Sequence, residues 1–394
     1  MLMKIVFIGQ KGFPAKGGGV ENYVHNLALG LVKKDHEVIS YTRKYYACGG
    51  EYKGVKVIET PSLKSKNLDA ISHTFTSIIH SLSIKNIDII HINSVGPGLL
   101  IPFMKLMYSL KSLFVGNRPK IVFTFHSADW EHGKWGKFAK IMLKVGAYLG
   151  CNFADEVVTV SKSLRQIAKR EFGINATYIP NGTNTYKINS DKLIKNFGLE
   201  KREYIVFIAR LVPHKNAHIL IEAYKKMANN FGKKLVIVGG SANTDEYVSE
   251  LENSIKDNPN IIMTGHQSGN TLKQLFANAG CYVLPSSSEG LSISLLEAGS
   301  FGLPVIISDI KENKEIVGEY GYVAKTNSII SLKNQLENVF NNYNEATKKA
   351  ELLQNHIKNE YTWDKIIKST EFVYERDSYK LRGTQINQMT LHYR

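Results

Sequence analysis

Two glutamates stand eight residues apart in the segment Pro285–Pro304, which reads PSSSEGLSISLLEAGSFGLP. Glu289 follows three serines, whereas Glu297 lies among leucines and an alanine, where an unpaired charge is costly. Serines and acids favour helix starts, so we expect both carboxylates near one face of a helix, roughly 12 Å apart along its axis. Two such carboxylates can accept hydrogen bonds from the hydroxyl groups of a ligand. The alternative is that Glu297 turns to water or pairs with a lysine.

A second candidate site is the glycine run Gly17–Gly19, which follows an apolar strand pattern and opens a helical one. Such a loop points free backbone N–H groups and the positive end of a helix dipole at an anion, so it suits a phosphate. The run matches neither GxGxxG nor the Walker A pattern. The next strand, His36–Tyr41, is not followed by an acid for a ribose, which argues against NAD. A plain tight turn is the alternative.

Cations follow a later apolar strand, Ile205–Ala209. Arg210 and Lys215 would converge at the carboxyl edge of its sheet, where a planar fork and a point charge suit a diphosphate. His126 ends another strand at the same kind of edge, although a lone histidine is as often structural. Both cations could instead be solvated surface charges. Because no DxD or DxH pair occurs, we expect these groups to neutralise a diphosphate without a metal.

The chain of 394 residues is long enough for two domains. Ile205–Ala209 repeats Ile5–Gly9 almost letter for letter, and each begins a series of strands alternating with helical patterns. Such alternation predicts two parallel sheets covered on both faces, with ligands at the carboxyl ends of the strands. The fold class we expect is therefore α/β, with two facing, doubly wound Rossmann-like domains and a cleft between them. The segment 180–184 and a charged helix after it would form the linker, and residues 329–379 would be helical.

The expected strands are 3–9, 36–41, 54–59, 87–92, 120–126 and 155–160 in the first series, and 205–209, 234–239, 260–264, 280–284 and 304–308 in the second.

The composition of the chain limits the classes of binding partner. A net charge of +15 suits nucleic acid, an anionic bilayer or a phosphorylated ligand. Nucleic acid is the weakest of the three, because no zinc finger, RRM signature or basic block occurs. Three separated cysteines indicate neither disulfides nor zinc, which suits a reducing cytoplasm, and no signal peptide is expected. The segment 95–116 has lysines near its middle, so we expect an amphipathic helix and not a membrane span.

In this order and spacing, the motifs resemble those of retaining GT-B glycosyltransferases of family GT4. The resemblance covers nearly the whole chain and rests on the E-x7-E pattern from Glu289 to Glu297, the glycine loop, the strand ending in His126, Ile179–Gly182, Arg210 with Lys215, LEAGSFGLPVI, and Tyr361-Thr362-Trp363. The segments PAKGGGVENYV and HSADWEHGKWGKFAK are similar to those of bacterial enzymes that build capsule, exopolysaccharide or O-antigen units.

The resemblance implies an acceptor-side domain over residues 1–184, a nucleotide-sugar domain over 185–361, and a helix over about 362–394 that crosses back to the first domain. It also implies roles for individual residues. His126 and Glu289 would be catalytic and contact the transferred sugar; Gly18, Gly19, Arg210 and Lys215 would hold the donor diphosphate; Glu297, Gly290, Leu291 and Ser292 would bind ribose and sugar; Asp129, Trp130, Lys134 and Trp135 would lie on the acceptor side.

The resemblance further implies a nucleotide-diphosphate sugar as donor, with UDP preferred over GDP, no cofactor or metal, and transfer with retention. Residues 99–150 carry a local net charge of +6 with interleaved aromatic residues, which suits docking on an anionic inner-membrane surface from the cytoplasm. The acceptor would then be an undecaprenyl-diphosphate-linked saccharide. A merely solvated basic face remains open, as do a nucleotide-sugar epimerase or phosphorylase on the same fold and a non-catalytic lipid-binding or nucleic-acid-binding protein.

Overall fold

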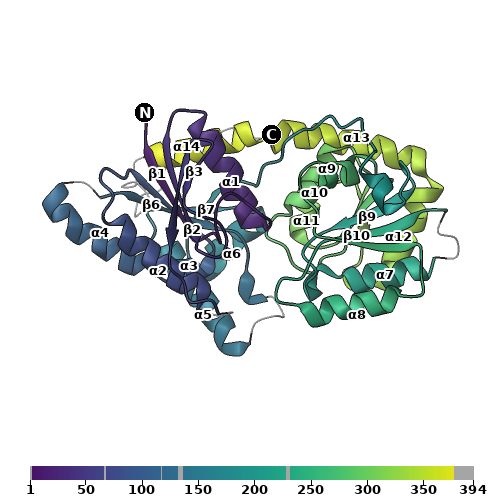
Figure 1. Cartoon of the computed structure of the whole chain (residues 1–394), viewed down its shortest axis with the longest axis horizontal. Coiled ribbons are helices and arrows are strands. Elements are labelled where there is room, and N and C mark those ends of the chain that lie inside the picture. Colours follow the sequence, from purple (N-terminus) through teal and green to yellow (C-terminus); the bar gives the residue numbers. More distant parts are fainter. Residues whose placement is uncertain (1, 66–67, 117, 132–135, 228–230, 377–394) are drawn as a thin grey trace.

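The computed structural model describes the chain except residues 1, 66–67, 117, 132–135, 228–230 and 377–394. Figure 1 shows two α/β domains side by side, each a sheet between layers of helices, with two long helices running along the top of both. The central strands of both sheets are apolar and buried on both faces, as parallel sheets covered by helices require. The two-domain Rossmann-like prediction is confirmed.

The first sheet has eight strands in the order β3-β4-β2-β1-β5-β6-β7-β8, and all neighbouring pairs are parallel except β3–β4. The strands are β1 Lys4–Ile8, β2 Glu37–Arg43, β3 Gly50–Tyr52, β4 Val55–Thr60, β5 Ile89–Asn93, β6 Lys120–Phe125, β7 Glu156–Thr159 and β8 Thr177–Tyr178. The helical elements are α1 Gly19–Val32, α2 Asp69–Ser81, α3 Val95–Gly98, α4 Ile101–Val115, the 3-10 turn η1 Asp129–Glu131, α5 Lys137–Phe153 and α6 Lys162–Phe172.

The second sheet has six strands in the order β11-β10-β9-β12-β13-β14, all parallel. The strands are β9 Tyr204–Ile208, β10 Lys234–Val238, β11 Ile261–Gly265, β12 Cys281–Leu284, β13 Val305–Ser308 and β14 Tyr322–Ala324. The helical elements are η2 Ile194–Phe197, η3 Pro213–Lys215, α7 Ala217–Lys225, α8 Asp245–Ile255, α9 Gly269–Ala277, α10 Ile293–Ser300, α11 Lys311–Val317, α12 Ile329–Asn341, α13 Tyr343–Glu360 and α14 Trp363–Glu375. Because β1 and β9 each lie inside their sheet, the repeated apolar motif marks equivalent central strands.

Several local expectations were wrong or incomplete. The short edge strands β3, β8 and β14 have too few apolar residues to stand out from loops, and the sequence did not predict them. The charged helix expected directly after the 180–184 linker is absent from residues 185–193, and only the single turn η2 follows. The amphipathic helix expected over 95–116 is broken into α3 and α4. Within the described residues, no helix combines the length and apolarity needed to cross a bilayer.

The chain returns to the first domain through α14, which packs on α1 (Figure 1). Trp363 is 7 % exposed, and its ring packs closely on Gly182. A methyl group at position 182 would be 2.7 Å from the ring. Gly30 of α1 leaves room for Ile367 in the same way. At the far end of α14, Arg376 forms an ion pair with the buried Glu156. The domain boundary at 184/185 stays a prediction, but α14 is part of the first domain's core.

We expect Trp363→Ala to lower the free energy of unfolding by about 3–5 kcal/mol, because it removes a buried aromatic ring and leaves a cavity. Urea denaturation followed by circular dichroism measures the loss. Phe372→Ala is the matched control, since Phe372 lies on the same helix and is 56 % exposed. Equal midpoints for the two variants would contradict the packing role of Trp363.

Candidate functional site

A cavity of about 500 Å³ lies between the two domains, where the carboxyl ends of their strands face each other. Its walls contain eleven of the fourteen residues for which the sequence predicted a role. They are Gly18, Gly19, His126, Asp129, Arg210, Lys215, Glu289, Gly290, Leu291, Ser292 and Glu297. Trp130 lies elsewhere, and Lys134 and Trp135 fall outside the described residues.

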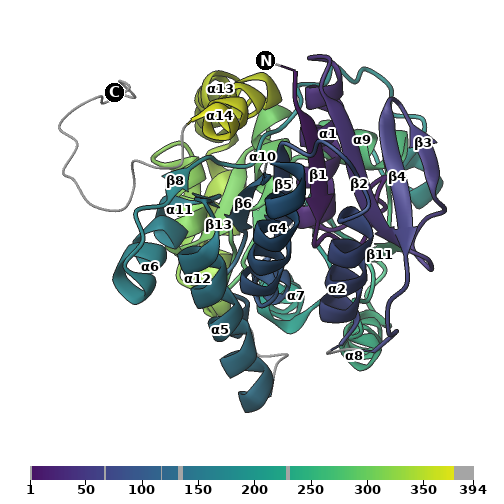
Figure 2. The same cartoon turned by 90° about the vertical axis from the view of Figure 1, so that its left-hand side faces the viewer.

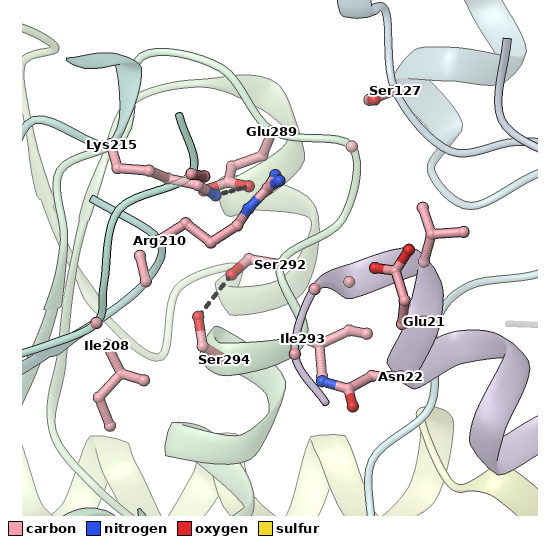
Figure 3. A pocket seen from close by; sticks show the side chains of 18 of the residues that line it. Glu21, Asn22, Ser127, Ile208, Arg210, Lys215, Glu289, Ser292, Ile293 and Ser294 are labelled. Carbon is pink, nitrogen blue, oxygen red and sulfur yellow. Dashed lines mark hydrogen bonds and ion pairs between the residues drawn. The ribbon is translucent and has the colours of Figure 1, made fainter. Parts of the chain in front are cut away.

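The cations come from the loop after β9. Arg210 follows the strand directly, and Lys215 ends the η3 turn (Figure 3). The Lys215 Nζ lies 2.5 Å from each carboxylate oxygen of Glu289, and both side chains are largely buried. Figure 3 shows the Arg210 guanidinium beside this ion pair. The cleft therefore holds two positive groups, one of which is paired with an acid from the same domain.

The two glutamates of the E-x7-E pattern do not share a helix, contrary to our expectation. Helix α10 begins at Ile293 with Ser292 as its N-cap, so Glu289 lies in the preceding loop. The Ser292 hydroxyl accepts a hydrogen bond from the Leu295 N–H at 3.3 Å and lies 3.2 Å from the Ser294 hydroxyl. The serines at 286–288 did not start the helix because the loop continues to Ser292. The positive end of α10 therefore opens into the cleft.

Glu297 lies one turn into α10 and is partly buried in the cleft wall. Burial raises the pKa of this carboxyl to about 7, and the positive charge of Lys273 opposes the rise. Among the described residues, Glu297 forms no ion pair. The alternative that it pairs with a lysine is therefore wrong, and Lys273 acts on it only through its charge. When the Glu297 carboxyl is ionised, both of its oxygens can accept hydrogen bonds from ligand hydroxyls.

The glycine loop opens α1 from the opposite side of the cleft. Gly18 has φ +99°, and a methyl group at this position would lie 2.0 Å from the Glu21 carboxylate. Glu21 lies in the first turn of α1, accepts a hydrogen bond from the Lys11 N–H at 2.9 Å and lines the cavity. The sequence analysis missed Glu21, although an acid in the first turn of a helix was a readable signal. His266 also lines the cavity, and a methyl group at Gly17 would lie 3.3 Å from its ring, so the two residues approach each other closely from the two domains. Nothing in the sequence marked His266.

His126 follows β6 and is 7 % exposed. Burial lowers the pKa of its imidazole to about 3, so the ring stays neutral at physiological pH. The His126 Nε2 lies 3.0 Å from Asn93 Oδ1, and the Asn93 amide donates to the His91 carbonyl at 3.5 Å. These contacts assign the ring proton to Nε2, which donates to Asn93. Asn93 was not predicted, because an asparagine at the end of a strand has many other uses.

The two domains touch beside His126. A methyl group at Gly290 would lie 1.7 Å from the His126 carbonyl oxygen. The side-chain amide of Asn181, from the linker, donates to the Leu291 carbonyl at 2.8 Å. The loop that carries Glu289 thus lies directly against the strand end that carries His126. Only glycine at position 290 permits this approach.

Of the residues expected on the acceptor side, Asp129 and Trp130 lie in different surroundings. Asp129 lines the cavity and accepts a hydrogen bond from the Ser127 hydroxyl at 2.5 Å. Trp130 instead stacks on Phe125, with ring centroids 5.8 Å apart, and contacts Phe172. It therefore packs on the first domain next to Asp129 and does not line the cavity, and its place on the acceptor side stays a prediction.

Comparisons with known proteins agree with this architecture. The model of the family described as Glycosyltransferase Family 4 matches residues 17–187, and that of Glycosyl transferases group 1 matches residues 189–362. An uncharacterized glycosyltransferase of Methanocaldococcus jannaschii is 26 % identical over 95 % of this chain and 98 % of its own. The UDP-Gal:alpha-D-GlcNAc-diphosphoundecaprenol alpha-1,3-galactosyltransferase of Escherichia coli is 25 % identical over 72 % of this chain and 75 % of its own.

Solved structures share the fold. Sucrose-phosphate synthase from Thermosynechococcus elongatus superposes with a TM-score of 0.78 at 18 % identity, covering 94 % of this chain and 98 % of its own. Anabaena HepE in complex with UDP and glucose superposes with a TM-score of 0.75 at 20 % identity, covering 94 % and 99 %. Two Rossmann-like domains around such a cleft define a GT-B glycosyltransferase fold. With both family models matched in succession, the chain belongs to the group 1 glycosyltransferases.

We expect Gly290→Ala to lower glycosyl transfer about 100-fold, because the added methyl group pushes the Glu289 loop off His126 and a shift of this size disrupts reacting geometry. The measurement is turnover at saturating donor, with thermal melting to verify folding. Gly136→Ala is the control, since a methyl group there meets no atom within 4 Å. Full turnover by Gly290→Ala would exclude this contact from the active state.

Proposed function

We propose that this protein is a retaining glycosyltransferase that moves a sugar from a UDP-sugar to a saccharide carried on a lipid diphosphate. A GDP-sugar is the second choice of donor. The capsule, exopolysaccharide and O-antigen pathways of bacteria use such acceptors, and the enzyme would work at the cytoplasmic side of the inner membrane. Two comparisons support the choice: HepE was solved with UDP and glucose, and the E. coli relative is named for a UDP-sugar and a diphosphoundecaprenol-linked acceptor.

The observation that carries the proposal is the convergence of Arg210, Lys215 and two helix N-termini on one cavity. A donor diphosphate carries two negative charges, and two cations with the amides of Gly18 and Gly19 can balance them. The Lys215–Glu289 ion pair has a consequence for binding. It holds the ammonium group inside the cleft, and an incoming phosphate must share Lys215 with Glu289 or take the place of Glu289.

The remaining polar groups would orient the donor. Glu297 would accept hydrogen bonds from the ribose hydroxyls, and Glu289, with the backbone of Gly290 to Ser292, would face the transferred sugar. The Ser292 hydroxyl already caps α10, so we assign the sugar contact at this position to the loop backbone. His126 would lie near the reacting carbon, where its neutral ring can accept a hydrogen bond from a sugar hydroxyl but cannot act as a charged acid.

Retention follows if the acceptor hydroxyl attacks from the face that the diphosphate leaves. The bond between the anomeric carbon and the phosphate oxygen breaks, the bond to the acceptor oxygen forms, and the leaving phosphate takes the acceptor's proton. Lys215 and Arg210 then stabilise the charge on the leaving group, a task that metal ions perform in other enzymes. Glu289 is tied to Lys215 and serves as an electrostatic group facing the electron-poor sugar ring. We therefore propose that transfer needs no metal.

An epimerase on the same fold and a non-catalytic binding protein make different predictions. An epimerase would interconvert the donor without an acceptor, which product analysis by chromatography distinguishes from transfer. A binding protein that uses only its basic surface would be unaffected by changes inside the cleft. The buried polar cleft and the two family matches favour transfer.

We expect Lys215→Ala to lower turnover about 100- to 1000-fold, the usual cost of removing one group that stabilises a developing negative charge. The measurement is release of the nucleoside diphosphate from UDP-sugars, with GDP-sugars in parallel. Lys256→Ala, at an exposed position on α8's carboxyl side, is the control.

Assays in EDTA test the absence of a metal requirement at the same time. A loss of activity that Mg²⁺ restores would refute the metal-free proposal, whereas wild-type turnover by Lys215→Ala would refute the site itself.

We expect donor affinity to rise with pH up to about 7 and then to level off, because the raised pKa of Glu297 means that its carboxyl must lose a proton to accept both ribose hydroxyls. Below this pKa, affinity falls by at most about tenfold per pH unit. Titration calorimetry with UDP-glucose measures it, since the donor's diphosphate keeps its charge in this range.

Glu297→Gln should bind about 10- to 100-fold more weakly, with no such pH dependence, because a hydrogen bond to a charged group is lost. An unchanged pH profile in Glu297→Gln would assign the titration to another group.

A further inference from the structure

Four polar side chains form a row on one face of the first sheet, inside an otherwise apolar core. His91 and Asn93 belong to β5, Thr124 belongs to β6, and His126 directly follows β6. All four residues are buried. Residues two positions apart on a strand point to the same face, so the row leads from the core to the cavity that His126 lines. Buried polar groups are costly unless they are hydrogen-bonded, so their partners show what the row does.

The inner part of the row joins the sheet to the C-terminal helix. The His91 Nδ1 lies 2.6 Å from the Tyr374 hydroxyl of α14, and its Nε2 lies 2.6 Å from the Thr124 hydroxyl. Burial lowers the pKa of the His91 imidazole to about 3, so this ring is neutral. Helices α1 and α14 cover this face of the sheet, opposite to α2 and α4 (Figure 2). Both nitrogens of His91 are therefore occupied by structural contacts, and none is left for a ligand.

The outer part of the row is the contact between Asn93 and His126. Asn93 is completely buried, and its Oδ1 lies 3.0 Å from the His126 Nε2. The orientation of the Asn93 amide follows from its other neighbour, the His91 carbonyl oxygen, which lies 3.5 Å from Nδ2. A flipped amide would place two acceptor oxygens against each other at that point. The Oδ1 atom therefore faces His126, and the ring proton of His126 lies on Nε2.

The second ring nitrogen of His126 faces the cleft. Within the described residues, Nδ1 has no hydrogen-bond partner, and it is not one of the polar atoms that are buried without a partner. It is therefore the nitrogen that is open to the cavity. The Tyr23 ring of α1 packs edge-to-face on the imidazole, with ring centroids 4.8 Å apart, and restricts its rotation. A half-turn of the imidazole would replace Nε2 by a carbon atom and lose the contact with Asn93.

We propose that Asn93 is a positioning residue for sugar transfer: it fixes the proton of His126 on Nε2, so that the lone pair of Nδ1 points at the sugar. The role in transfer rests on the proposed function, whereas the position of the proton does not. The sugar becomes electron-poor as its bond to the leaving phosphate breaks. A lone pair beside it is then stabilising, and an N–H group in the same place would be repulsive. Asn93 therefore acts on turnover and not on nucleotide binding.

An asparagine suits this task better than an aspartate. A carboxylate beside a histidine favours the charged imidazolium, because an opposite charge raises the pKa of the ring. The imidazolium carries a proton on both nitrogens and has no lone pair to present. The amide oxygen of Asn93 accepts the Nε2 proton without adding a charge, so His126 stays neutral in its buried position.

Nitrogen NMR of the full chain with isotope-labelled histidine tests the position of the proton, without substrate present. The signal of His126 is assigned by its loss in His126→Gln. We expect the wild-type ring to be neutral and protonated on Nε2 at neutral pH. In Asn93→Leu, which is similar in size but has no acceptor, a mixture of both neutral tautomers should appear. A wild-type ring protonated on Nδ1 or on both nitrogens, or an unchanged tautomer in Asn93→Leu, would overturn the proposal.

Kinetics separate positioning from folding. We expect Asn93→Leu to lower kcat about 10- to 100-fold, the size of effect expected when one buried hydrogen bond is lost. Titration calorimetry should show that UDP binds to this variant as it does to the wild type. Asn93→Asp restores the acceptor and the Nε2 proton, but its charge should move the rise of kcat to higher pH than in the wild type. An unchanged kcat in Asn93→Leu, or an equal loss of UDP binding, would exclude a positioning role.

Asn278→Leu is the matched control. Asn278 is a buried asparagine of the second domain, and its amide donates to the Ser190 carbonyl at 3.1 Å. Its replacement has a similar cost for folding, which thermal melting measures, but it should leave the His126 tautomer and kcat unchanged. A loss of kcat equal to that of Asn93→Leu would count against Asn93. A wild type with the expected tautomer and no sugar transfer would refute the proposed function, and with it the role in transfer, but not the assigned proton.

Discussion

The negative charge that we expect in the cleft is the constraint around which this protein is organised. A diphosphate enters a partly dry space only if positive groups already point into it, and both domains provide them at the ends of their strands. The second domain contributes Arg210, Lys215 and the start of α10, and the first contributes the start of α1. The parallel strands of both sheets make this possible, because each of them delivers the following loop to the same edge.

The same cleft also contains acids, and their placement explains its electrostatics. Glu289 pairs with Lys215, and Glu21 beside the glycine loop accepts a hydrogen bond from the Lys11 amide. Burial in the cleft wall raises the pKa of Glu297, and the positive charge of Lys273 only partly opposes the rise. The acids therefore offset part of the positive charge that lines the cleft, and substrate binding would redistribute an existing charge pair.

The sequence predicted the features that follow from local residue patterns. It did not predict those that depend on contacts between segments far apart in the chain. Apolar runs predicted the central strands, and the carboxyl-edge rule predicted that Arg210, Lys215, His126 and Glu289 would meet. The prediction that Glu289 and Glu297 share a helix was wrong, because Ser292, and none of the earlier serines, is the N-cap. The packing of Trp130 on Phe125 and Phe172 was not predicted, because Phe172 is distant from it in the sequence. Asn93 and the fit of Gly290 against His126 depend on contacts between domains or strands, which no local pattern records.

The position of α14 has a consequence for synthesis of the chain. Trp363, Ile366, Ile367 and Val373 belong to the same buried cluster as β1 and α1, although more than 300 residues separate them. The domain that leaves the ribosome first therefore cannot close its core until almost the whole polypeptide has been made. During that interval the exposed apolar residues of the first domain would be a target for chaperones. The second domain waits less, because all the strands of its sheet come from one continuous part of the chain.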